Sequence, residues 1–92
     1  MEYLNQELCM GPSKKNLLQL CKDYDRPFYV YDRELITLRY QQMTEALKNC
    51  RLYFAVKANP NLEVLSLLKS LGCGADVVSV GEIRRALEAG FK

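Results

Sequence analysis

The sequence has no histidine and no tryptophan among its 92 residues, and only 3 prolines and 5 glycines. The lack of histidine removes the commonest general base and the commonest metal ligand of enzymes. The low glycine and proline content excludes a collagen-like chain, and no segment is of low complexity. The hydrophobic fraction of 49% and the charged fraction of 26% are those of one small globular domain.

The four cysteines, Cys9, Cys21, Cys50 and Cys73, include no C-x-x-C pair, and no histidine is present to complete a zinc site. The first residues lack the basic and then apolar pattern of a signal peptide, so we expect free thiols and a cytoplasmic location. No apolar run approaches the roughly 20 residues of a membrane span. The net charge of +2 is scattered along the chain, so neither nucleic acid nor an anionic membrane is an expected partner.

Residues 1–26 are predicted to form an N-terminal lead-in helix and loop, and residues 27–92 to begin the main domain. Ser13 is a candidate cap for the short helix, in which Leu17, Leu18 and Cys21 share one face.

Three strand–helix units are predicted after this lead-in, because β-branched and aromatic runs alternate with helical apolar periodicity. The expected strands are residues 28–31, 52–58 and 75–79, and the first helix carries the apolar stripe Ile36, Tyr40, Met43 and Leu47. The expected helix signals are Asp32, Asn59 with Pro60, and Ser79 with Glu82 at the starts, and Gly72 at one end.

Such alternation predicts an α/β fold with parallel strands and right-handed crossovers. Three parallel strands alone leave two unpaired edges and one uncovered face. We therefore expect the first units of an incomplete (β/α)8 barrel rather than a free-standing sheet.

Lys57 is the main candidate for chemistry. Strand alternation places Tyr53, Ala55 and Lys57 on one face and the larger apolar side chains on the other. Active sites of α/β barrels lie at the carboxyl ends of the strands, and a desolvated lysine there is a usable amine that can form a Schiff base. The alternative is a solvated charge at a strand end, which is common.

Residues 53–59 (YFAVKAN) resemble the cofactor-lysine motif of the fold-type III pyridoxal-phosphate decarboxylases, the ornithine, lysine, diaminopimelate and arginine group. Residues 26–32 (RPFYVYD), 71–79 (LGCGADVVS) and 81–91 (GEIRRALEAGF) resemble three further segments of that family in the same order. The resemblance covers about residues 16–92 and is strongest to diaminopimelate decarboxylase.

The resemblance implies an alanine-racemase-like barrel that binds pyridoxal 5'-phosphate covalently through Lys57, with Ala55 and Asp76 beside the cofactor. It further implies decarboxylation of meso-diaminopimelate to L-lysine and a homodimeric full-length form. From the residues alone, Asp76 could equally be a solvated or capping carboxylate. Tyr53 is better explained as filling of the barrel, and Ser79 as a helix cap.

Phosphate-binding and substrate-specifying residues of the family, and its C-terminal β-domain, have no counterpart here. The 92 residues are therefore expected to be an inactive N-terminal fragment. Ornithine, arginine and carboxynorspermidine decarboxylases remain alternatives. A racemase or small cofactor-binding protein of the same barrel type fits the opening segment and the third strand less well. A non-catalytic remnant is the alternative from a different functional class.

Overall fold

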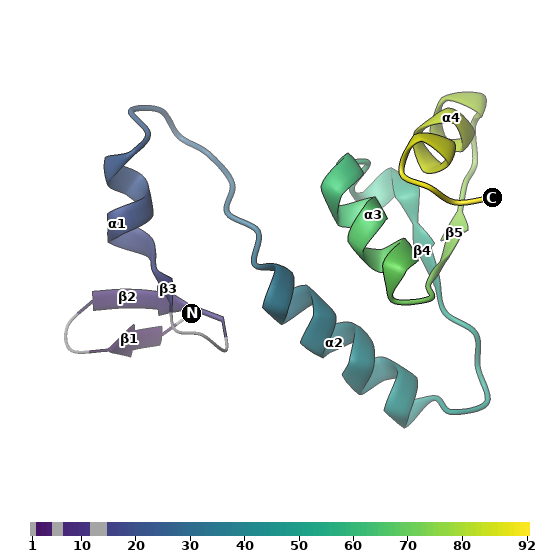
Figure 1. Cartoon of the computed structure of the whole chain (residues 1–92), viewed down its shortest axis with the longest axis horizontal. Coiled ribbons are helices and arrows are strands. Elements are labelled where there is room, and N and C mark those ends of the chain that lie inside the picture. Colours follow the sequence, from purple (N-terminus) through teal and green to yellow (C-terminus); the bar gives the residue numbers. More distant parts are fainter. Residues whose placement is uncertain (1, 5–6, 12–14) are drawn as a thin grey trace. The chain divides into compact units, whose positions relative to one another are not determined.

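The structure is a computed structural model that describes residues 2–4, 7–11 and 15–92. The chain divides into two compact units, Met1–Ile36 and Thr37–Lys92. Figure 1 labels the helices and strands of each unit.

The N-terminal unit contains a small antiparallel sheet that the sequence did not predict. Strands β1 (Glu2–Leu4), β2 (Glu7–Met10) and β3 (Lys15–Asn16) pair in that order. Such short strands carry too little alternation to be recognised, because the cross-strand partner rather than the local pattern selects them.

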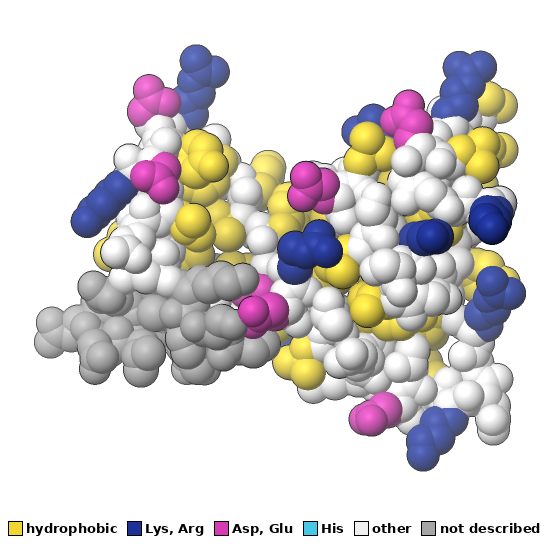
Figure 2. Space-filling model, in the orientation of Figure 1, with side chains coloured by type: hydrophobic (Ala, Val, Ile, Leu, Met, Phe, Trp, Pro, Cys, Tyr) yellow, Lys and Arg dark blue, Asp and Glu magenta, His cyan; other side chains and the backbone are white. Residues whose placement is uncertain are grey.

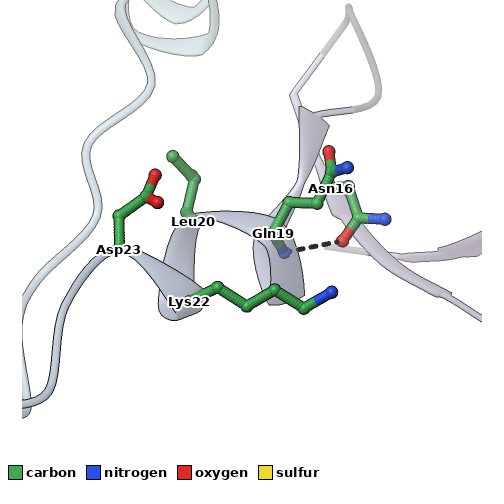
Figure 3. Close-up of a pocket in the computed structure, with 5 residues that line it drawn as sticks. All are labelled: Asn16, Gln19, Leu20, Lys22 and Asp23. Carbon is green, nitrogen blue, oxygen red and sulfur yellow. Dashed lines mark hydrogen bonds between the residues drawn. The ribbon is translucent and has the colours of Figure 1, made fainter.

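The predicted lead-in helix is present as α1 (Leu17–Lys22). Ser13, its expected cap, lies outside the described residues. Asn16 caps the helix instead, and its Oδ1 accepts a hydrogen bond of 3.2 Å from the Gln19 N–H (Figure 3). The residues drawn with this cap line an open pocket at α1.

The predicted strand over residues 28–31 is wrong: these residues form no strand in the structure. Tyr29 is 89% exposed, and the ring of Phe28 packs on that of Tyr24 with centroids 4.9 Å apart. An apolar run becomes a strand only when a neighbouring strand accepts its backbone hydrogen bonds. No described segment pairs with this one.

Asp32 caps the following helix as predicted. Its Oδ1 accepts from the N–H groups of Glu34 (2.9 Å) and Leu35 (3.2 Å), and the side chain is buried. Gly11 lies against this carboxylate with φ of 80°, and a Cβ there would overlap the Asp32 side chain. The position therefore requires glycine for both its backbone angle and its lack of a side chain.

Helix α2 (Arg33–Ala46) carries the predicted apolar stripe, but none of its residues is buried. Met43 is 52% exposed and Leu47, just beyond the helix, is 44% exposed. Helix formation here follows the local sequence, and within the described residues the stripe is only partly covered, at Ile36 and Tyr40. Exposed hydrophobic side chains are visible between charged ones in Figure 2.

The C-terminal unit contains two strand–helix units. Strand β4 (Tyr53–Ala55) is followed by a 3-10 turn, η1 (Val56–Ala58), and helix α3 (Leu62–Ser70). Strand β5 (Gly74–Asp76) pairs with β4 in parallel and leads to helix α4 (Val80–Glu88). A parallel pair needs a crossover, which α3 provides (Figure 1). The predicted α/β alternation is confirmed for these two units.

The core of this unit centres on Val56, Leu65 and Ala89, and Phe54 packs against it from β4. Val56 and Leu65 are fully buried. The expected helix-facing apolar set is therefore confirmed at Phe54 of β4 and at Val56, which lies just beyond the strand in η1.

Helices α3 and α4 each end at a glycine in the left-handed region. Gly72 follows α3 with φ of 99°, and Gly90 follows α4 with φ of 107°. The next residues close the helices, because the Cys73 and Phe91 N–H groups donate to the carbonyls of Leu68 and Ala86. These are Schellman-type ends, in which only glycine adopts the required angles without strain. Gly72 is confirmed as the predicted helix end.

The isolated 92-residue chain is expected to melt over a broad temperature range or to aggregate. Each strand of the two-stranded parallel sheet has an unpaired edge, and a complete barrel of this kind needs on the order of 250 residues. Circular dichroism during heating, with light scattering, tests this. A sharp cooperative transition of a monomer would show that this core suffices.

Candidate functional site

Lys57 lies in the 3-10 turn η1, directly after strand β4. The prediction that it ends the strand is wrong by two residues, since β4 stops at Ala55. The turn forms because Val56 must point into the core and the Asn59 N–H donates to the Val56 carbonyl at 3.1 Å. Lys57 nevertheless stays at the carboxyl end of β4, the end that the sequence predicted.

The candidate cofactor residues Ala55 and Asp76 are brought together by the sheet. They are directly opposite each other in the parallel register of β4 and β5, each as the last residue of its strand. Lys57 follows Ala55 by two positions. All three candidate residues therefore stand at the same edge of the sheet. Whether Ala55 and Asp76 touch a cofactor stays a prediction.

The Lys57 side chain is exposed. Within the described ranges, no hydrogen bond or ion pair engages its amine. The desolvation invoked from the sequence is therefore not provided by the residues described here. The amine is open to a reactant.

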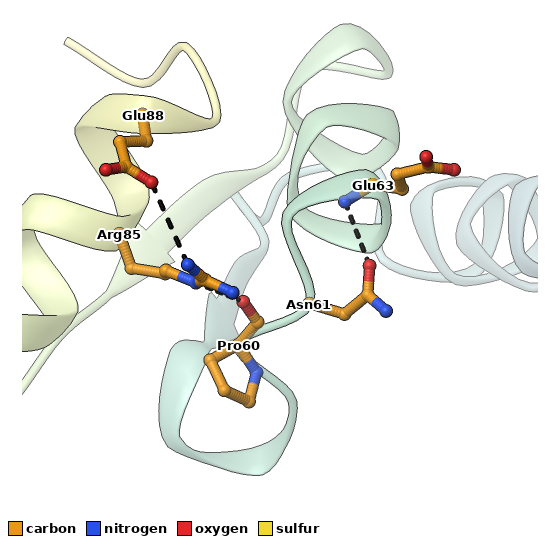
Figure 4. Close-up of polar contacts among 5 residues, drawn as sticks. All are labelled: Pro60, Asn61, Glu63, Arg85 and Glu88. Carbon is orange, nitrogen blue, oxygen red and sulfur yellow. Dashed lines mark hydrogen bonds and ion pairs between the residues drawn. The ribbon is translucent and has the colours of Figure 1, made fainter. Parts of the chain in front are cut away.

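The segment after Lys57 is held by two asparagines. The Asn59 Oδ1 accepts from the Asn61 N–H at 3.1 Å. The Asn61 Oδ1 accepts from the Glu63 N–H at 2.9 Å (Figure 4) and from the Val64 N–H at 3.3 Å. The prediction that Asn59 caps α3 with Pro60 as its first residue is wrong. Both asparagines suit a cap, but the Asn59 Oδ1 accepts from the Asn61 N–H ahead of the helix, and Asn61 is the residue that caps α3, which begins at Leu62.

Arg85 makes a contact near Lys57 that the sequence did not predict. Its Nε donates to the Pro60 carbonyl at 2.9 Å, so α4 is joined to the segment that follows Lys57 (Figure 4). Its Nη1 lies 3.8 Å from the Glu88 Oε2. The spacing of Arg85 and Glu88 on a helix could have indicated their pairing, but no local signal indicates a contact with Pro60.

Ser79 caps α4 as predicted. Its Oγ accepts from the Glu82 N–H at 3.1 Å. The Glu82 side chain turns back, and its Oε1 accepts from the Val78 N–H at 3.2 Å. In the usual capping box this carboxylate reaches the N–H of the cap residue itself, so the contact here is shifted by one residue.

Tyr53 on β4 lies directly opposite Gly74 on β5 in the register of the two strands. A Cβ on Gly74 would collide with the Tyr53 ring, and the Arg51 guanidinium lies 5.2 Å from the centre of that ring. Tyr53 is 56% exposed. The ring covers the glycine of the neighbouring strand, which supports the structural interpretation of Tyr53 given above.

Cys21, Cys50 and Cys73 are free thiols, as predicted. The Cys9 side chain lies outside the described part of the structure. Cys73 is buried, which raises the pKa of its thiol, and its Sγ donates to the Gly74 carbonyl at 3.3 Å. In the described ranges no group of three or more candidate metal ligands gathers, and no helix is both long and apolar enough to cross a membrane.

Comparison with known proteins identifies the family. The profile described as "Pyridoxal-dependent decarboxylase, pyridoxal binding domain" matches residues 33–92. The chain belongs to this family. The resemblance that the four motifs indicated is thereby confirmed.

Relatives of this pyridoxal-binding domain include diaminopimelate decarboxylase from Helicobacter pylori strain J99, 48% identical over 84% of the chain and 20% of the relative. The crystal structure of the Helicobacter pylori enzyme complexed with L-lysine has a TM-score of 0.73 and 47% identity, with 84% of this chain and 20% of that one covered. A crystal structure from Aquifex aeolicus has a TM-score of 0.87 and 37% identity, with 98% and 22% covered. The chain thus spans about a fifth of these relatives' length.

The predicted fold class, the opening units of a TIM-like barrel, is confirmed by these neighbours and by the family. The missing strand at residues 28–31 and the 3-10 turn at Lys57 are departures in detail. They leave the parallel pair of β4 and β5 intact.

Proposed function

We propose that the complete polypeptide containing this sequence is a pyridoxal-phosphate-dependent carboxy-lyase that converts meso-diaminopimelate to L-lysine. The observation that carries the proposal is the exposed amine of Lys57 at the carboxyl end of two paired parallel strands. The relatives named diaminopimelate decarboxylase, and the L-lysine bound to one of them, support the choice of substrate.

The residues at this edge of the sheet fit a pyridoxal group. Within the described ranges the Lys57 amine is accessible and uncommitted. Ala55 is small and half-buried, and leaves room beside the strand end. Lys57 would hold the cofactor through its amine, while Ala55 and Asp76 would line its site.

When bound, pyridoxal phosphate supplies a ring that accepts the electron pair left as carbon dioxide departs. The residues of this chain would bind and orient the cofactor. The burial of Val56 fixes the backbone next to Lys57, so the long lysine stem pivots from a defined point.

A homodimer in the cytoplasm, with no nucleic-acid or membrane partner, completes the proposal. Phosphate-site and substrate-specifying residues would come from the rest of the polypeptide. Ornithine, arginine and carboxynorspermidine are the alternative substrates, since the residues that would discriminate among them are not in this segment.

Release of carbon dioxide by the complete natural polypeptide tests the substrate. We expect kcat/KM for meso-diaminopimelate to exceed that for L-ornithine and L-arginine by at least about 10²-fold, because a site built to hydrogen-bond a polar group rejects substrates that leave its partners unpaired. Equal or faster release from ornithine would contradict the choice of substrate. Absence of both turnover and visible cofactor absorbance would favour the non-catalytic alternative.

A further inference from the structure

Arg85 joins two segments that are far apart in the sequence. It stands on α4, and its Nε donates to the carbonyl of Pro60, 25 residues earlier, at 2.9 Å. Pro60 lies three residues after Lys57, between η1 and α3. Figure 4 shows the guanidinium extended from α4 toward this carbonyl.

The helix that carries Arg85 is itself held in place. Ala89, directly after α4, belongs to the same core cluster as Val56 and Leu65. The Ser66 hydroxyl of α3 donates to the Ala89 carbonyl at 3.2 Å. The base of the Arg85 side chain is thus tied to the core against which η1 packs.

The segment from Lys57 to Asn61 is tied at its two ends. Val56 anchors the first end in the core, and Asn61 anchors the second as the cap of α3. Pro60, between them, has no N–H, so its carbonyl is its only backbone hydrogen-bonding group. Arg85 donates to that carbonyl.

The Nε–H of arginine is a directional donor on a planar group, and it stays charged at every physiological pH. The second contact of the guanidinium, with Glu88, is longer at 3.8 Å, and both side chains are largely exposed at 45% and 63%. Exposed pairs of this kind contribute little. The bond to Pro60 is therefore the contact that matters.

We propose that Arg85 is a positioning residue for Lys57. Its bond to Pro60 holds the segment after η1 against α4, and so sets the direction from which the lysine amine meets the cofactor. The cofactor part of this inference rests on the proposed function; the effect on the loop does not.

The test compares Arg85→Ala and Arg85→Lys in the complete natural polypeptide with Arg84→Ala as matched control. Arg84 is the exposed neighbour on the same helix, and no hydrogen bond or ion pair engages it within the described residues. Glu88→Gln separates the ion pair from the bond to Pro60.

The first readout is amide hydrogen exchange in cofactor-free protein. The Asn59 and Asn61 amides, both hydrogen-bonded here, are expected to exchange about tenfold faster in both Arg85 variants, the effect of losing one charge-assisted hydrogen bond. The Leu65 amide of α3 should be unchanged. Arg84→Ala and Glu88→Gln should match the wild type.

The second readout is the equilibrium dissociation constant for pyridoxal phosphate, which we expect to rise about tenfold in the Arg85 variants. Equal exchange and equal affinity in Arg85→Ala and Arg84→Ala would overturn the inference. So would faster exchange that extends to Leu65, because Arg85 would then support the whole unit rather than the loop. A third outcome combines faster loop exchange in the Arg85 variants with a wild-type protein that binds no pyridoxal phosphate. That outcome would overturn the proposed function, and with it the role of Arg85 toward the cofactor.

Discussion

Lys57→Ala is expected to lower decarboxylation by the complete polypeptide by at least about 10³-fold, the scale on which positioned catalytic groups act. The reason is that in the proposed function the cofactor is held by the amine of Lys57, which stands at the carboxyl edge of the β4–β5 pair. Visible absorbance of the lysine-bound cofactor should disappear as well. Borohydride reduction followed by peptide mapping should place the cofactor mass on the wild-type peptide that contains Lys57.

Lys57→Arg should be as inactive as Lys57→Ala. Arginine keeps the positive charge, but its guanidinium stays protonated and is no attacking amine. A lysine with only a structural role would tolerate this change. Lys48→Ala is the control, since Lys48 is exposed and follows α2, and it should retain full activity. Cofactor mass on Lys48 or Lys69 would refute the assignment.

Leu65→Ala is expected to lower the free energy of unfolding by about 3 kcal/mol, within the range for buried leucines. Leu65 is fully buried, with 0% of its surface exposed to solvent, and belongs to the core cluster with Val56 and Ala89. Its truncation would leave a cavity beside the turn that carries Lys57. Denaturant unfolding of the complete polypeptide, followed by circular dichroism, measures the loss.

Leu18→Ala is the matched control for that measurement. Leu18 is 56% exposed on α1, so its truncation should change the unfolding free energy by no more than about 0.5 kcal/mol. An equal loss in both variants would mean that the cluster around Leu65 is not the main core of the unit.

Local signals in the sequence were reliable where one or two neighbouring residues satisfy the backbone. Asp32 and Ser79 cap their helices, and Gly72 ends α3, as predicted. These features depend on side chains within three or four residues and on glycine's freedom at positive φ. The inward placement of Phe54 on β4 likewise follows from strand geometry.

Extended segments were predicted less well, because a strand is defined by its partner. Residues 28–31 have the composition of a strand but pair with nothing described, whereas the weakly patterned residues of β1 and β2 pair with each other. The end of β4 at Ala55 also depends on tertiary contacts. Burial of Val56 and the closing bond from Asn59 turn the chain before Lys57.

The sequence by itself determined the family, through four motifs in order, and the identity of the candidate lysine. Only the tertiary structure decided what surrounds that lysine. It put Asp76 in register with Ala55, left the Lys57 amine exposed, and brought Arg85 to the Pro60 carbonyl. The physical reason is the same for each. Residue type and near-neighbour spacing are local properties, but strand register, burial and contacts across 25 residues exist only once the helices have packed.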